Sequence, residues 1–167
     1  MYLQIFIKFV ILLTKLLLER NMIGEHYEIK PRKRKTLFYF VSEGEQGEIL
    51  KVIGFQLIRG KIWNIYFGDI TESGFSDSVV SNNADIYKIM NTVTFALYQF
   101  MEEYPSRIVR IAPVDEKRKR LYNAIFQRRI NEIETNFDVF AKKGKRFEVN
   151  SPNTTYSIFE LHFKKDS

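Results

Sequence analysis

The pattern with the clearest chemical meaning is a run of four cations, Lys-Arg-Lys-Arg at residues 117–120, near the start of a predicted helix. The unpaired amides of a first helical turn already give that end a partial positive charge. Added cations are therefore unfavourable there unless an anion lies nearby, and Asp115 and Glu116 supply only part of that charge. The run indicates a site for a phosphate-like ligand.

Two further cations lengthen this charged surface. Arg128 follows Lys117 by eleven residues, and Arg129 follows Arg118 by the same interval, which is close to a whole number of helical turns. These positions therefore share a helix face with the run. The candidate anion-binding residues are Lys117, Arg118, Lys119, Arg120, Arg128 and Arg129.

Two other basic clusters occur at residues 30–35 and 142–146, and both adjoin predicted strand ends. If the three clusters formed one patch, it would bind nucleic acid through phosphates, with a strong salt dependence and little reading of base sequence. The competing interpretation is three separate solvated surfaces. The sequence leaves both open.

Composition limits the remaining chemistry. The chain has 167 residues, a net charge of +6, 45% hydrophobic residues and no cysteine. This length and apolar content predict one folded domain, and the absence of cysteine excludes disulfides and thiolate chemistry. His26 and His162 stand far apart in the sequence, so we expect no metal site and no cofactor.

Residues 1–23 form an apolar, amphipathic segment. Lys8 and Lys15 interrupt it and lie on one helical stripe, which favours an interfacial or packed helix over a membrane span. Its flanks are not those of a secretion signal. An alternative is that Met22 is the natural start and residues 1–21 are not native. We therefore expect a cytoplasmic protein with membrane contact only if residues 1–20 are native, and a single domain at 24–167.

The domain alternates strand and helix patterns. Predicted strands are at 36–42, 48–59, 61–69, 107–112, 134–141 and 156–163, and predicted helices are at 86–104 and 115–131. The first three strands are joined by short links and predict an antiparallel meander. The order βββ-α-β-α-ββ predicts an α+β fold with a mixed, mainly antiparallel sheet and helices packed on its faces.

Three short motifs give a resemblance to a family. They are Phe38-x-Phe40-x-Ser42-x-Gly44, then Asn82-Asn83-x-Asp85, then Arg118-x-x-Leu121-Tyr122. With them, residues 22–163 resemble a family of short bacterial proteins of unknown function. The resemblance implies no activity.

The element order also resembles the central part of acyl-CoA N-acyltransferases. That resemblance implies acetyl-CoA as the ligand and Tyr122 as the acid that protonates the leaving thiolate. The loop at 81–85 departs from the family because it has no glycine and carries Asp85 where the pyrophosphate would bind. The alternative role of Tyr122 is packing in the core beside Phe126.

The opening order also resembles nucleases of the RNase H-like class, which hold two divalent metals on carboxylates. Glu43, Asp85 and Asp115 occupy comparable places in the sequence. Asp85 and Asp115 are also natural helix-capping residues, and we expect capping rather than metal binding.

Our preferred expectation is a non-catalytic basic module that binds an anionic partner, nucleic acid first. One alternative is acyl transfer through Tyr122. Another is a protein-interaction component, such as half of a defence or toxin–antitoxin pair, that binds a protein partner. The sequence leaves open whether the protein is an enzyme and whether it forms a homodimer.

Overall fold

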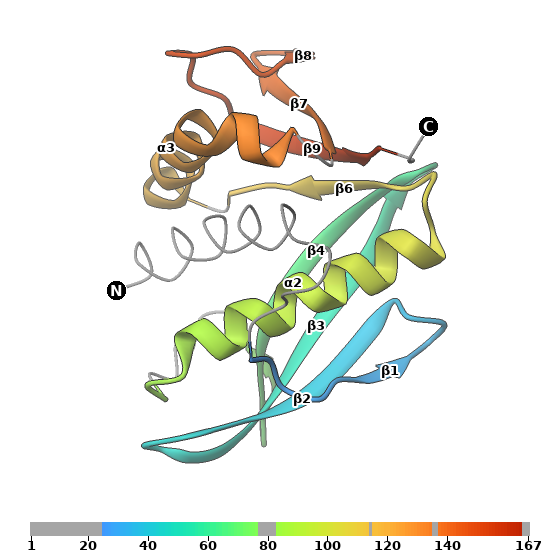
Figure 1. The fold of residues 1–167 in the computed structure, drawn as a ribbon, viewed down its shortest axis with the longest axis vertical. Helices are drawn as coiled ribbons and strands as arrows, with labels where there is room; N and C mark the ends of the chain where they lie inside the picture. Colours follow the sequence, from blue (N-terminus) through green and yellow to red (C-terminus); the bar gives the residue numbers. More distant parts are fainter. Residues whose placement is uncertain (1–24, 77–82, 114, 135–136, 165–167) are drawn as a thin grey trace.

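A computed structural model describes residues 25–76, 83–113, 115–134 and 137–164, which contain two helices and one nine-stranded sheet (Figure 1). The helices are α2 (Ile86–Glu103) and α3 (Glu116–Ile133). The strands are β1 (Lys30–Arg32), β2 (Leu37–Gly44), β3 (Gly47–Arg59), β4 (Ile62–Thr71), β5 (Gly74–Ser76), β6 (Ile108–Ile111), β7 (Phe137–Lys143), β8 (Arg146–Val149) and β9 (Ile158–Phe163).

The sheet is mixed and mainly antiparallel, as predicted. Its order is β1-β2-β3-β4-β6-β9-β7-β8, with β5 paired to one end of β4. The β4–β6 pairing is parallel, and helix α2 provides the crossover between these strands. The predicted order lacked β1, β5 and β8, because each has only three or four residues and too few side chains to show an alternating pattern.

Both described helices pack on the same face of the sheet. Phe100 of α2 stacks on Phe55 of β3 with ring centroids 4.0 Å apart, and Phe126 of α3 stacks on Phe159 of β9 at 3.9 Å. Cross-strand register places these strand residues on one side of the sheet. The predicted helices therefore pack on the sheet as expected, and within the described residues they share a single face. We call the opposite side the outer face.

Helix α2 lies across β2, β3 and β4 in Figure 1. Its buried residues include Val93, Leu97 and Phe100, whose helical spacing produces a continuous apolar stripe. The helix ends at Glu103, just before Pro105, as the sequence predicts. The Tyr104 amide still donates to the Phe100 carbonyl at 2.9 Å, so the chain leaves the helix in a fixed direction.

None of the described helices is long and apolar enough to cross a membrane. The predicted amphipathic segment at residues 1–23 lies outside the described residues. So do residues 135–136, which fall within the predicted strand at 134–141.

Removing the Phe100 ring tests the shared core. Phe100 is fully buried, so Phe100→Ala should lower the free energy of unfolding by about 3–5 kcal/mol in urea denaturation. Val149→Ala is the control, because Val149 is 61% exposed and its truncation should cost less than about 0.5 kcal/mol. Equal losses in the two variants would contradict this core.

Candidate anion-binding surface

Helix α3 carries the predicted cations, and one of them, Lys119, forms an ion pair with Glu116 in the first turn. The Lys119 Nζ lies 3.2 Å from Glu116 Oε1, and Arg120 is exposed. An exposed pair of this kind is weak. The other predicted positions lie on α3, but their side chains are outside the described part of the structure: Lys117, Arg118, Arg128 and Arg129. The anion site on α3 therefore stays a prediction.

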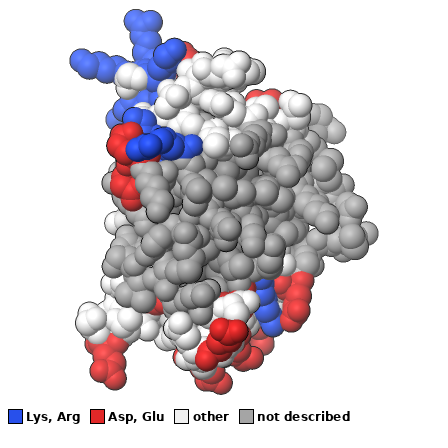
Figure 2. All heavy atoms as spheres, turned by 90° about the vertical axis from the view of Figure 1, so that its left-hand side faces the viewer, with Lys and Arg blue, Asp and Glu red and all other residues white. Residues whose placement is uncertain are grey.

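The interpretation that all three basic clusters form one patch is wrong. Residues 30–35 belong to β1 and its turn, whereas residues 142–146 form the β7–β8 turn. Strands β1 and β8 end the two opposite sides of the sheet order. Figure 2 shows basic side chains gathered at the upper end, the height of β7 and β8 in Figure 1, and acidic ones at the lower end.

The β1–β2 turn has an unusual backbone. Lys33, Arg34 and Lys35 have φ angles of 47°, 53° and 59°, so three successive cationic residues adopt the left-handed conformation. For residues with a Cβ this conformation costs roughly 1–2 kcal/mol each. Such strain persists only where surrounding contacts impose it.

The end of α2 supplies those contacts. The Tyr104 hydroxyl donates to the Arg34 carbonyl at 2.6 Å, and Lys35 Nζ lies 3.1 Å from Glu103 Oε2. Thr36 closes the turn from the other side, because its hydroxyl donates to the Lys33 carbonyl at 2.9 Å. The strained turn is thus held against the last turn of the helix.

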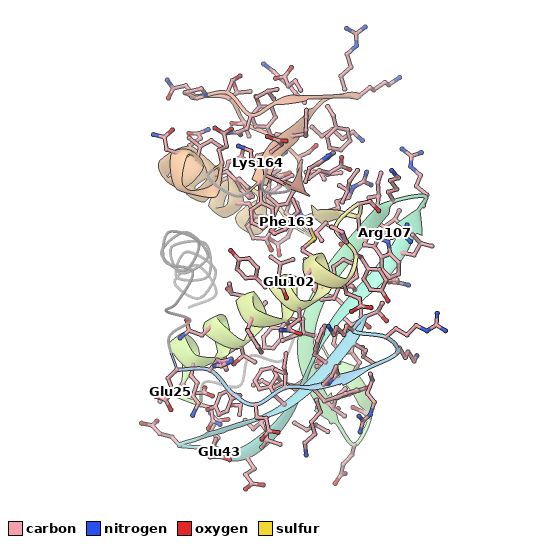
Figure 3. The ribbon with its side chains drawn as sticks, turned by 45° about the vertical axis from the view of Figure 1, so that its right-hand side comes forward. Glu25, Glu43, Glu102, Arg107, Phe163 and Lys164 are labelled. Atoms are coloured by element: carbon pink, nitrogen blue, oxygen red, sulfur yellow. The ribbon has the colours of Figure 1, made fainter. Side chains whose placement is uncertain are left out.

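The β3–β4 turn joins the same end of the molecule. The Trp63 ring stacks on Tyr104 at 6.3 Å between centroids, and the Arg107 guanidinium lies 5.9 Å from the Trp63 ring. Arg107 also donates to the Gly60 carbonyl at 3.4 Å, and Figure 3 shows it beside the ends of β3 and β4. Two turns and the start of β6 therefore meet there.

We call this surface the basic end. It consists of Lys33, Arg34, Lys35, Arg59, Lys61 and Arg107. Lys33, Arg34 and Lys35 belong to a basic cluster that is evident in the sequence, whereas Arg59, Lys61 and Arg107 join them only in the fold. The antiparallel meander was the available signal, since the start of β2 and the end of β3 must lie at one end of a sheet.

The first two family motifs meet where α2 begins. Asp85 Oδ2 accepts hydrogen bonds from the Ser42 hydroxyl at 2.6 Å and the Tyr27 hydroxyl at 2.7 Å. The Asn83 side chain donates to the Gly47 carbonyl at 2.9 Å and accepts from the Gln46 amide at 2.7 Å. These bonds fasten the β2–β3 hairpin to the start of the helix. Asn82 of the motif lies outside the described residues.

The surroundings of this cluster change the pKa values of two of its side chains, Tyr27 and Lys88. Burial raises the pKa of the Tyr27 hydroxyl above its usual value; the hydrogen bond with the Glu43 backbone lowers it by less, and the hydrogen bond to Asp85 raises it further. The Tyr27 hydroxyl therefore stays protonated and donates to the Asp85 carboxylate. Lys88 lies 4.4 Å from the Tyr27 ring and pairs with Glu25, whose hydrogen bond raises the pKa of the Lys88 ammonium.

Two of the nuclease-like residues, Asp85 and Glu43, make contacts within the fold. Asp85 accepts the Ile89 amide through its carbonyl, but its carboxylate makes no capping bond, so the predicted side-chain cap is wrong. Glu43 is bound through its backbone to the Tyr27 hydroxyl. Within the described ranges, no group of three His, Asp or Glu side chains could hold a metal ion.

Tyr122 of α3 is partly buried and packs against the hydrophobic core. This is the packing role that its helical neighbours indicate. Phe126, one turn later, is fully buried. The acid role of Tyr122 in acyl transfer has no support from this placement.

Two largely buried ion pairs join neighbouring strands, one on each face of the sheet. Lys51 and Asp69 are cross-strand partners on the helix side, with 3% and 4% of their side chains exposed. On the outer face, Arg110 Nε donates to Glu160 Oε1 at 2.9 Å. His162 lies beside Glu160, and burial lowers the pKa of its imidazole, so it adds no cation at neutral pH.

These features define a basic α+β domain with helices on one face of a mixed sheet. Residues 24–164 match the model of a family of unknown function, DUF6934, and the chain belongs to that family. The family that the sequence motifs suggested is thereby confirmed. A comparison with curated proteins and one with solved structures give no match, and the acyltransferase resemblance gains no support.

Gly44 tests the junction between the family motifs. A Cβ at this position would lie 1.8 Å from the Asn83 carbonyl oxygen, so Gly44→Ala must displace the hairpin from the helix start. We expect a loss of about 1–3 kcal/mol in the free energy of unfolding, measured in urea. Glu45→Ala, at the exposed neighbouring position, should leave it nearly unchanged. A Gly44→Ala variant as stable as the parent would show that the hairpin and the start of the helix are not closely packed.

Proposed function

We propose that this protein is a non-catalytic module that binds nucleic acid through phosphate contacts at the basic end. The observation that carries the proposal is the left-handed turn at Lys33, Arg34 and Lys35, held by Tyr104 and Glu103. Strained backbone that neighbouring residues maintain is typical of functional sites.

Charge at the basic end supports this proposal. Lys35 is paired with Glu103, but no carboxylate in the described part of the chain pairs with Arg34, Arg59 or Lys61. All three of these side chains are exposed. Their charge is therefore available to an external anion.

The arrangement favours a polymer over a small ligand. The cations come from the β1–β2 turn, the β3–β4 turn and the start of β6, so they are spread over a surface. Successive phosphates of a nucleic acid strand can contact such a surface without base-specific hydrogen bonds. Binding should therefore be strongly salt-dependent and tolerant of sequence.

Charge reversal tests the location of the site. The Arg34→Glu/Lys61→Glu variant should bind a fluorescein-labelled duplex at least about tenfold more weakly at low salt, measured by anisotropy. Each phosphate contact that is lost should also reduce the slope of log affinity against log salt by about 0.9.

The matched control is Lys143→Glu/Lys145→Glu, which makes the same charge change in the β7–β8 turn at the opposite side of the sheet. It should lose much less affinity. A Lys117→Glu/Arg120→Glu variant tests the site predicted on α3 in the same assay. Equal losses in the Arg34/Lys61 variant and the Lys143/Lys145 control would show that only net charge matters and would reject a site at the basic end.

The strained turn makes a separate prediction. Asn tolerates the left-handed conformation better than Arg, so Arg34→Asn should raise the free energy of unfolding by a few tenths to about 1 kcal/mol while weakening duplex binding. Arg59→Asn removes an equal charge from a position that is not in the left-handed conformation and should give no such gain. If Arg34→Asn lowered the free energy of unfolding, the backbone of the turn would not be strained at Arg34, and strain would not support a functional site there.

A further inference from the structure

The outer face of the meander carries a continuous apolar band. Val41 and Leu50 are cross-strand partners, as are Ile70 and Phe75. Lys51, which follows Leu50, is the cross-strand partner of Asp69, which precedes Ile70. The Val41–Leu50 pair therefore lies next to the Ile70–Phe75 pair. The band therefore crosses β2, β3, β4 and β5.

This band is exposed in the single chain. Val41, Leu50 and Phe75 are 37%, 42% and 47% exposed. They point away from α2, because the neighbouring Phe40, Ser42 and Lys51 are buried on the helix side. No described helix covers the outer face. Exposed apolar side chains gathered in this way mark an interaction surface.

Two aromatic rings lie close to the backbone of the sheet beside the band. Two glycines lie on the outer face of β3 and β4, and a Cβ at Gly54 would lie 2.0 Å from the Tyr66 ring. A Cβ at Gly68 would lie 2.6 Å from the Phe75 ring. The glycines therefore leave room for the Tyr66 and Phe75 rings to pack against the backbone of the sheet.

Opposite charges border the band. Glu43 and Glu48 are cross-strand partners and form an acidic row two residues beyond Val41. On the other side, Tyr39 also stands two residues from Val41, and its partner on β1 is Lys30. Arg32, the next residue of β1 on that face, extends the basic border. All four charged side chains are exposed.

We propose that the outer band is a homodimer interface. A twofold axis running across the strands, in the plane of the interface, places the band of one copy on the band of the other and reverses the strand direction. Glu43 of one copy then lies over Tyr39 of the other, beside Lys30 on the neighbouring strand, so each acidic row lies next to the basic border of the second copy. A twofold axis along the strands would oppose like charges, so charge selects the first arrangement.

This inference does not depend on nucleic-acid binding, because it uses none of the exposed cations Arg34, Arg59 and Lys61. The dimer would carry one basic end at each side, since strand direction is reversed between the copies. A partner of different sequence would need its own matching acidic and basic borders, whereas a second copy supplies both.

Sedimentation velocity of the full chain tests the interface. The parent should sediment as a dimer at micromolar concentration, and Leu50→Asp should raise the dimer dissociation constant by at least about tenfold. Val149→Asp is the control, because Val149 is also exposed but lies on β8, far along the sheet order, and this variant should remain dimeric. Circular dichroism establishes that both variants are folded.

A charge exchange tests the arrangement. Glu43→Lys/Glu48→Lys and Lys30→Glu/Arg32→Glu should each weaken the dimer, and the variant with all four substitutions should regain most of the parent affinity. A monomeric parent, or a dimer that Leu50→Asp leaves intact, would overturn the interface. A four-residue variant as weak as the two-residue variants would overturn the twofold axis across the strands.

Discussion

Helix α2 is fixed at both of its ends, and the basic end of the molecule depends on that constraint. At the start of the helix, Asp85 and Asn83 bind the β2–β3 hairpin through side-chain hydrogen bonds. At its end, the Tyr104 hydroxyl binds the Arg34 carbonyl while its ring stacks on Trp63. The stacked rings of Phe55 and Phe100 set the height of the helix between these points. The left-handed turn has its conformation because the helix ends where it does.

Placing both described helices on one face has a second consequence. The core forms between these helices and one side of the sheet, so the outer face of the meander receives no cover from them. Its apolar band then needs a partner, which the proposed dimer supplies. The two proposals use different surfaces: exposed cations beyond the strand ends for nucleic acid, and strand faces for a second copy. Reversing the strands in the dimer keeps both basic ends accessible.

The long elements were predictable because their patterns extend over many residues. The α2 stripe of Val93, Leu97 and Phe100 and the meander strands repeat often enough to identify each structure. The short strand β8 was not predictable, since all four of its residues are exposed and show no alternation. Which face of the sheet each helix covers depends on how distant segments of the chain associate. The local periodicity of the sequence carries no information on that.

The candidate site was predictable only in its chemistry. The basic charge pointed to an anion, but counting cations along the chain drew attention to residues 117–120. The basic end combines residues 33–35 with Arg59 and Arg107, which are distant in sequence and meet only because antiparallel strands return to one edge. Asp85 shows the converse limit: its position before a helix predicted a cap, yet its carboxylate binds Ser42 and Tyr27. No local rule favours that choice.

The most direct test of the central claim is an NMR titration of the ¹⁵N-labelled protein with a short duplex, following the backbone amide resonances. If nucleic acid binds at the basic end, the resonances of residues 33–36, 59–61 and 107 should shift in a saturable and salt-sensitive way, while those of residues 142–146 should not move. Shifts confined to residues 117–120, or spread evenly over every basic segment, would contradict binding there.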